Sequence, residues 1–495
     1  MPSAVVIGSG FGGIASALRL KSLGLDVHLV ERLASIGGRA QFFEHHQYKH
    51  DAGPTVITAP FLFDELFALF GEQRSDAIEF RELSPWYRFI YPDGDHFDYG
   101  GSIEHTLDQI KRICPQDCAG YQALVDHSKA IYQVGFEQLA DQPFHHFSSM
   151  LKQIPRLASL RCDRSVWDVV NKYLTHDKLK QAFSIQPLLV GGSPFDTTSI
   201  YGLIHYLERA YGIHFAMGGT GALVKALENL MLRQGVSIQT NATVSEIIFS
   251  KRRACGVKLA TGEQIAADYV VFNGDPMHMY RNMIADPLLP MQTRLKRDTS
   301  KLSMGLYVLF FGTDRQYQDV AHHTIWLGKR YKELLDDIFH RQILADDFSL
   351  YIHRPTATDA SFAPAGHDSF YVLAPVPHQG ANINWQQQEP QLRERIVHAL
   401  DATLLPNLKQ HIQAPFAMTP DDFASDYLSH LGAGFSIAPL FRQSAWFRFH
   451  NKAEGFENLF LTGAGTHPGA GMPGVISSAK VVARLVQDAM EKKAA

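Results

Sequence analysis

Hydrophobic residues in the first forty positions follow two different periods. Residues 4–7 form a short apolar run that ends at a glycine, and Ile14 and Leu18 then recur with helical spacing. Residues 26–31 read as a second strand with the acidic residue Glu31 at its end. The pattern predicts a strand, a helix and a second strand in succession, which is the repeating unit of parallel α/β sheets.

The glycines between the first predicted strand and helix have the spacing of a dinucleotide-binding turn. One glycine permits the tight turn, one lets the backbone approach a pyrophosphate, and one lets the helix pack closely on the strand. The helix N-terminus offers N–H groups to phosphate oxygens, and Glu31 is placed to accept a hydrogen bond from a ribose hydroxyl. A glycine-rich turn without a ligand is the alternative, which the order strand, helix, strand and acid disfavours. The predicted binding residues of this turn are Gly8, Gly10, Phe11, Gly12 and Gly13.

A second glycine pair, Gly37 and Gly38, follows the second strand and carries a cation directly after it. Arg39 would lie within reach of the same diphosphate, and we include Arg32, beside Glu31, in the candidate set. A solvated loop arginine is the alternative for Arg39. The arrangement resembles the extended fingerprint of FAD-dependent oxidoreductases of the amine oxidase and carotenoid desaturase superfamily, and it therefore favours FAD over NAD.

Later apolar runs predict the strands that complete the sheets. Two further helices are expected. One follows a third glycine cluster and carries Leu223, Leu227 and Leu230 on one face. The other spans 389–404 and has Pro390 in its first turn. The predicted strands are 236–240, 244–249, a hairpin through 255–265, 267–274, 304–312, 369–376 and 458–462.

Two further loops have the composition of cofactor loops. Gly53-Pro54 forces a rigid bend that could bring backbone close to a flat cofactor, although a surface turn is an equal alternative. The glycine-dense segment 463–474 lies between a predicted strand and a helix beginning at Ser477, so its N–H groups can approach a flavin without side-chain obstruction. A merely flexible loop is the competing interpretation. The candidates are Gly53, Pro54, Thr55, Val56, Gly463, Ala464, Gly465, Gly474 and Val475.

Composition narrows the class of protein without choosing a function. A chain of 495 residues exceeds one ordinary domain, and its net charge of −4 gives no argument for nucleic acid. The four cysteines lack zinc-site spacing, and we expect neither a signal peptide nor a spanning helix. His322 and His323 would point to opposite sides of a strand, so we expect a structural or interfacial role for them and no metal site.

One stretch has the pattern of an interfacial segment. Its apolar positions, from Phe147 to Leu157, fall on one helix face, and basic residues supply a positive rim, although Pro155 argues against one continuous helix. An ordinary core-facing helix with a solvated basic side is the alternative. The positions concerned are Phe147, Met150, Leu151, Lys152, Ile154, Arg156, Leu157, Arg161 and Arg164.

Taken together, these motifs resemble the bacterial-type phytoene desaturases over essentially the whole chain. The segments that carry the resemblance are 5–8, 51–58, 188–194, 218–223 and 463–471, the last being the most distinctive. The resemblance implies an FAD enzyme that removes hydrogens from phytoene in successive steps to give lycopene. It also implies that Val244 presents backbone groups to the adenine, that electrons pass to a quinone or oxygen, and that the enzyme sits peripherally on the cytoplasmic side of the cell membrane and draws its substrate from the lipid.

A substrate without polar atoms must be recognised by shape in an apolar tunnel. The weak candidates for a catalytic base are His467, in the glycine-dense segment, and Asp196, after a cavity-like turn, each set against a structural role. The expected fold is α/β, with a Rossmann-type FAD-binding domain (1–60, 215–300 and 430–495) interleaved with an α+β substrate-binding and membrane-associating domain (61–214 and 301–429).

Three alternatives stay open at this point. A desaturase of the same type could stop at neurosporene or another product. Another oxidoreductase of the flavin amine oxidase fold, acting on an amine or a porphyrinogen, would need different groups near the flavin. A prenyl-binding carrier of the same fold would bind no flavin, and it would have no reason to keep both phosphate-binding glycine loops.

Overall fold

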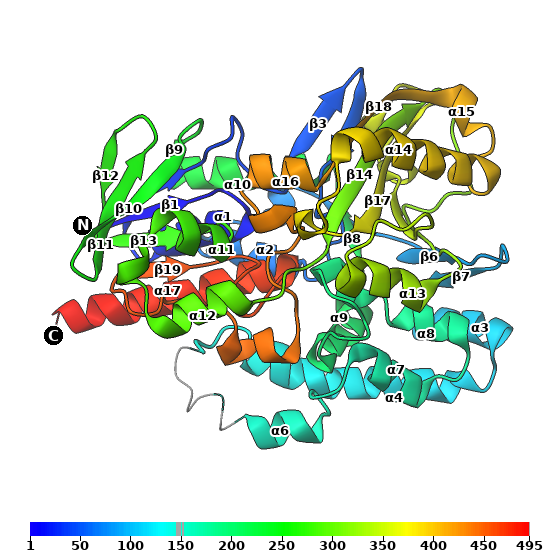
Figure 1. Ribbon diagram of the computed structural model, residues 1–495, viewed down its shortest axis with the longest axis horizontal. Coiled ribbons are helices and arrows are strands. Elements are labelled where there is room, and N and C mark those ends of the chain that lie inside the picture. Colours follow the sequence, from blue (N-terminus) through cyan, green and yellow to red (C-terminus); the bar gives the residue numbers. More distant parts are fainter. Residues whose placement is uncertain (145–149, 151–152, 495) are drawn as a thin grey trace.

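Five parallel strands form the sheet on the left of Figure 1, and they come from three distant stretches of the chain. The computed structural model describes residues 1–144, 150 and 153–494. The central strands are buried because both faces are covered: helices pack on one face, and two antiparallel strands, residues 244–250 and 253–259, pack with the segment 276–283 on the other. The strand order is β19 (Leu459–Leu461), β13 (Tyr269–Phe272), β1 (Ser3–Ile7), β2 (Asp26–Val30) and β9 (Ser237–Gln239).

Three helices pack together on this parallel sheet. Helix α1 (Phe11–Ser22) contacts both α10 (Gly219–Arg233) and α17 (Met472–Ala494), so the beginning and the end of the described chain share one core. A separate antiparallel sheet of three strands, β10 (Val244–Ser250), β11 (Arg253–Leu259) and β12 (Gln264–Ala266), lies at the outer side of this half of the molecule (Figure 1).

A seven-stranded sheet forms the core of the other half. Its strand β14, second in the order, is buried along its full length because alternate side chains enter two different cores. Leu306, Val308 and Phe310 face one core, and Tyr307 and Leu309 face the core under α14 (Trp385–Ala402). The strand order is β18 (Ile412–Met418), β14 (Gly305–Thr313), β17 (Asp368–Val376), β16 (Leu350–His353), β15 (His323–Trp326), β6 (Tyr87–Ile90) and β7 (His96–Tyr99).

Helices surround this second sheet. Figure 1 shows α14 and α15 at its outer side and a group of helices, α3, α4, α7, α8 and α9, below it. The remaining elements are α2 (Phe61–Ala68), α3 (Ile103–Ile113), α4 (Asp117–Tyr132), α6 (Ile154–Ser159), α7 (Val166–Tyr173), α8 (Asp177–Phe183), α9 (Leu203–Tyr211), α11 (Pro276–His278), α12 (Met291–Thr299), α13 (Tyr331–Asp336), α14 (Trp385–Ala402), α15 (Leu408–His411), α16 (Pro420–Tyr427), β3 (Phe42–His45), β4 (Tyr48–Asp51), β5 (Phe80–Glu82) and β8 (His214–Ala216).

The α/β fold class expected from the sequence is confirmed, and two helix boundaries were wrong. Helix α14 begins at Trp385, because the side chain of Asn384 caps it, so Pro390 lies inside the helix rather than in its first turn. Helix α17 begins at Met472, before the expected Ser477. The five-stranded and three-stranded sheets draw only on ranges 1–60, 215–300 and 430–495, and the seven-stranded sheet only on 61–214 and 301–429, so we keep the two-domain division as a proposal.

Candidate active site

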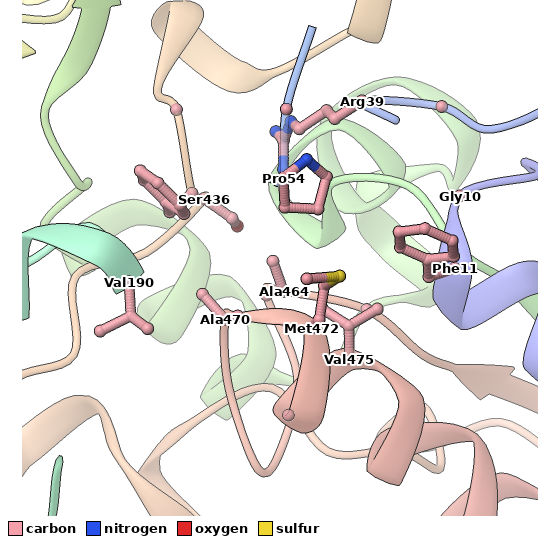
Figure 2. Close-up of a pocket in the computed structure, with 18 of the residues that line it drawn as sticks. Gly10, Phe11, Arg39, Pro54, Val190, Ser436, Ala464, Ala470, Met472 and Val475 are labelled. Atoms are coloured by element: carbon pink, nitrogen blue, oxygen red, sulfur yellow. The ribbon is translucent and has the colours of Figure 1, made fainter. Parts of the chain in front are cut away.

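One cavity of about 530 Å³ lies where the three glycine-rich bends meet. Figure 2 shows Arg39 and Pro54 on one side of this space and Met472, at the start of α17, on the other. Nearly all of the site residues expected from the sequence line it: Gly8, Gly10, Phe11, Glu31, Arg32, Gly37, Gly38, Arg39, Gly53, Pro54, Thr55, Val56, Val244, Gly463, Ala464, Gly465, His467, Gly474 and Val475.

Gly12 and Gly13 are exceptions, because they face the protein and not the cavity. A Cβ atom on Gly13 would lie 1.9 Å from the carbonyl oxygen of Gly8, and one on Gly12 would lie 2.5 Å from Oδ1 of Asn273. These two glycines therefore let α1 start close against β1 and β13. They shape the turn, while Gly8 and Gly10 form the wall.

Glu31 lies at the end of β2 with its carboxylate held in place. Its Oε2 accepts hydrogen bonds from the backbone N–H (2.9 Å) and the hydroxyl (2.6 Å) of Ser9, and its Oε1 accepts from the N–H of Leu33 (2.9 Å). The side chain is buried but lines the cavity. The acidic group expected to bind a ribose is thus fixed at the entrance of the nucleotide turn.

Arg39 brings a cation to the same cavity. Its Nη2 donates to Oγ of Ser429 at 2.5 Å, while its Nε has no protein partner. Burial lowers the pKa of its guanidinium, and nearby Asp275 opposes that shift. A guanidinium with an unused donor facing a cavity suits the oxygens of a diphosphate.

The C-terminal glycine loop is held from behind by a fully buried arginine. Arg448 donates from Nε to the carbonyl of Thr466 (2.9 Å) and from Nη2 to the carbonyl of Ala464 (2.5 Å). Asn451 donates to the carbonyl of His467 at 2.9 Å. Because these contacts fix the loop carbonyls, the loop presents a defined backbone surface to the cavity ahead of α17.

The far part of the cavity is apolar. Side chains from the seven-stranded sheet, from α9 and from the turn after α8 form this wall, and they offer shape rather than hydrogen bonds. They include Ile185, Leu188, Leu189, Val190, Ile204, Leu207, Leu306, Ile325, Leu373 and Phe435.

Glu208 is a carboxyl group in this apolar wall. It lies on α9 with no exposed surface, lines the cavity, and accepts a hydrogen bond from the hydroxyl of Tyr87 at 3.3 Å, while its Oε2 has no protein partner. Burial raises its pKa from 4.5 to about 8. A group poised near neutral pH beside an apolar cavity can exchange a proton there.

Of the two candidate bases taken from the sequence, His467 and Asp196, only His467 lines the cavity. His467 lines the cavity, and its Nε2 lies 3.0 Å from the carbonyl of Leu139, which leaves Nδ1 without a protein partner. Burial lowers its pKa to about 4, so the ring is neutral. Asp196 is not among the residues that line the cavity. Its Oδ2 instead lies 2.9 Å from Nε2 of the exposed His340, so we no longer propose Asp196 as the base.

Sequence reasoning missed several residues of the site. Asn273 and Asp275 line the cavity directly after β13, where the carboxyl end of a parallel strand commonly carries ligand contacts, so their position was the available signal. Asp275 is held by the N–H of His430 and the hydroxyl of Ser436, both at 2.8 Å. For Glu208 no such signal existed, because one glutamate in a helix looks like any surface glutamate.

Comparison with known proteins agrees with the fold and the site. A solved oxidoreductase from Methanosarcina mazei superposes with a TM-score of 0.64 at 15% identity, covering 98% of this chain and all of the other. The family model for flavin containing amine oxidoreductases matches residues 11–487, and the chain belongs to that family. It is thus an FAD-dependent oxidoreductase, and the glycine loops, Glu31 and the free donor of Arg39 fit that cofactor.

Within this family the chain belongs to the bacterial-type phytoene desaturases. It is 43% identical over 487 residues to a lycopene-forming phytoene desaturase of Pantoea ananas, covering 98% of this chain and 99% of that protein. It is 40% identical over 491 residues to a neurosporene-forming phytoene desaturase of Cereibacter sphaeroides, covering 98% and 95%. Among the described helices, none combines the length and hydropathy needed to cross a bilayer.

Proposed function

We propose that the protein desaturates phytoene in successive steps to lycopene. One observation carries the proposal: the nucleotide loops and a long apolar wall line the same cavity, so a hydrocarbon chain can lie beside the cofactor. The full-length similarity to lycopene-forming enzymes supports lycopene as the end product over neurosporene.

Cofactor binding falls to residues of all three bends. Gly8, Gly10 and the start of α1 would hold the diphosphate, Glu31 would bind the ribose, and Val244 would contact the adenine. Arg32, Arg39, the loops 37–38 and 53–56 and the loop 463–475 complete the cofactor site. Bound FAD supplies the acceptor for the hydride removed in each step.

Substrate recognition in this cavity is by shape. Phytoene has no charged or polar atom, so the wall of leucine, isoleucine and phenylalanine side chains excludes water and orients the chain. Positioning one saturated C–C bond is the main contribution that such a site can make to the rate.

Each desaturation also releases a proton from the neighbouring carbon. We assign its acceptance to Glu208, whose carboxylate form becomes populated as the pH approaches its raised pKa of about 8. His467 is the weaker candidate, because a pKa of about 4 makes its free Nδ1 a poor base.

The membrane surface is the source of such a substrate. Helix α6 projects from the lower edge of the molecule in Figure 1, with the side chains of Ile154, Arg156, Arg161 and Arg164 exposed. Phe147, Leu151 and Lys152 of the predicted amphipathic stretch lie outside the described residues, and Met150 is buried in a small core. Exposed apolar and basic side chains that lie together suit an anionic lipid surface, here the cytoplasmic side of the cell membrane.

The electrons taken from the substrate would pass to a quinone or to oxygen.

Pigment chemistry tests the proposal. Purified protein with FAD is incubated with phytoene in liposomes, and the products are separated by chromatography and identified by their absorption spectra. Lycopene is the expected end product, and accumulation of neurosporene would correct the number of steps. Unchanged phytoene in the presence of correctly bound flavin would remove the assignment, and a protein unable to bind flavin would favour the prenyl carrier.

A further inference from the structure

Three histidines meet in the interior of the seven-stranded sheet, outside the cavity lining. His323 of β15 pairs with His353 of β16, and His322 directly precedes β15. Each offers one nitrogen within 4.8 Å of the others, and the exposed fractions are 5% for His322 and 0% for the other two. The prediction that adjacent histidines diverge does not apply here, because strand alternation begins only at His323.

Hydrogen bonds orient two of these rings in the way that metal-binding imidazoles are oriented. Nδ1 of His322 lies 2.7 Å from the hydroxyl of Thr358, and Nδ1 of His323 lies 2.8 Å from the hydroxyl of Tyr351. Their Nε2 atoms, and both nitrogens of His353, are buried without a protein partner. A second hydrogen bond on the far nitrogen is the usual support of a histidine ligand.

An acidic group lies beside one of the three histidines. Oδ2 of Asp51 lies 3.6 Å from Nε2 of His353 and has no hydrogen-bond partner, while Oδ1 accepts from the N–H of Thr220 at 2.8 Å. Four side chains thus leave five buried polar atoms unpaired at one place, whereas buried polar groups normally have a protein, water or ion partner.

The charges beside the cluster do not oppose a cation. The neighbouring cation Arg354 is neutralised by Asp368, whose Oδ2 lies 3.0 Å from its Nε. Asp51, beside His353, adds an acidic side chain at the edge of the cluster.

We propose that His322, His323 and His353 bind one divalent transition-metal ion, with zinc as the best match. In tetrahedral zinc sites the bonds are about 2.1 Å, which places ligand atoms about 3.4 Å apart, so the three nitrogens, which lie within 4.8 Å of one another here, draw closer when the ion binds. The three rings are buried and lie outside the cavity lining, so the ion is structural. It braces the cavity wall, because the hydroxyl of Tyr351 joins His323 to Oγ1 of Thr55 (2.5 Å), and both Tyr351 and Thr55 line the cavity.

Metal analysis of the full-length protein tests this site. The protein is treated with a chelator, loaded with Zn²⁺, dialysed and measured by mass spectrometry for zinc per chain, and Co²⁺ is substituted to record the absorption of a tetrahedral site. About one zinc per chain, a cobalt spectrum of tetrahedral type and a higher melting temperature on zinc addition are expected. No retained zinc and no thermal shift would mean that ordered water alone fills the cluster, and would overturn the proposal.

Matched variants separate this cluster from other buried histidines. His323→Asn and His353→Asn are each expected to weaken zinc binding at least 100-fold. His205→Asn is the control, since His205 is equally buried with both nitrogens unpaired but lies on α9 outside the cluster. Zinc retained equally by all three variants would refute the assignment, and the measurements on the unmodified protein decide the question if a variant fails to fold.

Discussion

At the scale of single residues, the apolar wall of the cavity contains the carboxyl group of Glu208. Glu208 has no exposed surface, and burial outweighs the help of Tyr87 in setting its pKa near 8. Such a group is neutral below about pH 8, and the unfolded chain, with an ordinary pKa of 4.5, ionises first. Stability from this residue is therefore greatest at low pH and is lost as the pH rises from 4.5 towards 8.

Replacing this carboxyl group should slow the reaction without removing the cofactor. Glu208→Gln is expected to lower kcat about 100-fold, the usual range for a lost acid–base group, and to leave flavin content unchanged. The unmodified enzyme should become faster as the pH rises towards 8, and the variant should lose that rise. Asp196→Asn, outside the cavity, is the comparison and should keep near-normal kcat; equal pH profiles for Glu208→Gln and the unmodified enzyme would exclude the role of Glu208.

At the scale of elements, regular patterns gave correct predictions and irregular contacts did not. The segments 4–7, 26–30 and 267–274 contain β1, β2 and β13. β1 and β13 were predictable because buried parallel strands are continuous and apolar. Glycine spacing likewise located the loops that line the cavity. The pairing of Asp196 with His340, 144 positions apart, is a tertiary contact that no local pattern predicts. The start of α14 did have a local signal, because Asn384 is a favoured N-cap residue, and the prediction overlooked it.

The start of α1 should tolerate no side chain. In Gly13→Ala the new Cβ would meet the carbonyl of Gly8 at 1.9 Å, so the helix must shift; we expect a loss of about 3 kcal/mol in stability and weak flavin retention. Gly24→Ala, at the other end of the same helix, meets no atom within 4 Å and carries only the strain of its positive φ, about 1 kcal/mol. Thermal unfolding and flavin absorbance measure both, and normal flavin binding in Gly13→Ala would contradict the packing argument.

At the scale of the whole molecule, the proposed lipid-facing edge lies on the half that holds the apolar wall. Helix α6 is short, none of its residues is buried, and Pro155 stands in its first turn, which agrees with a break in the predicted amphipathic stretch. The basic side chains near it are exposed, while the chain as a whole carries a net charge of −4. Attraction to an anionic membrane would therefore be local.

Reversing two of these charges should release the protein from lipid. Arg156→Glu with Arg161→Glu is expected to weaken flotation with anionic liposomes at least tenfold, since each basic residue near such a surface contributes about 1 kcal/mol. The matched pair Lys251→Glu and Lys492→Glu, exposed on the other half, should float normally. Unaltered flotation of the first pair would discard α6 as the docking edge.

The pairing of β19 with β13 determines how late the nucleotide-binding sheet can be completed during synthesis of the chain. The wall of the cavity includes residues 463–475, and the edge strand β19 pairs with β13 only after more than nine-tenths of the chain has been translated. Until then β13 has an unpaired edge, which is a hazard for aggregation on the ribosome. Cofactor capture must consequently wait until residues 463–475 have been made, so flavin would stabilise the protein late in its folding and would not act as an early folding nucleus.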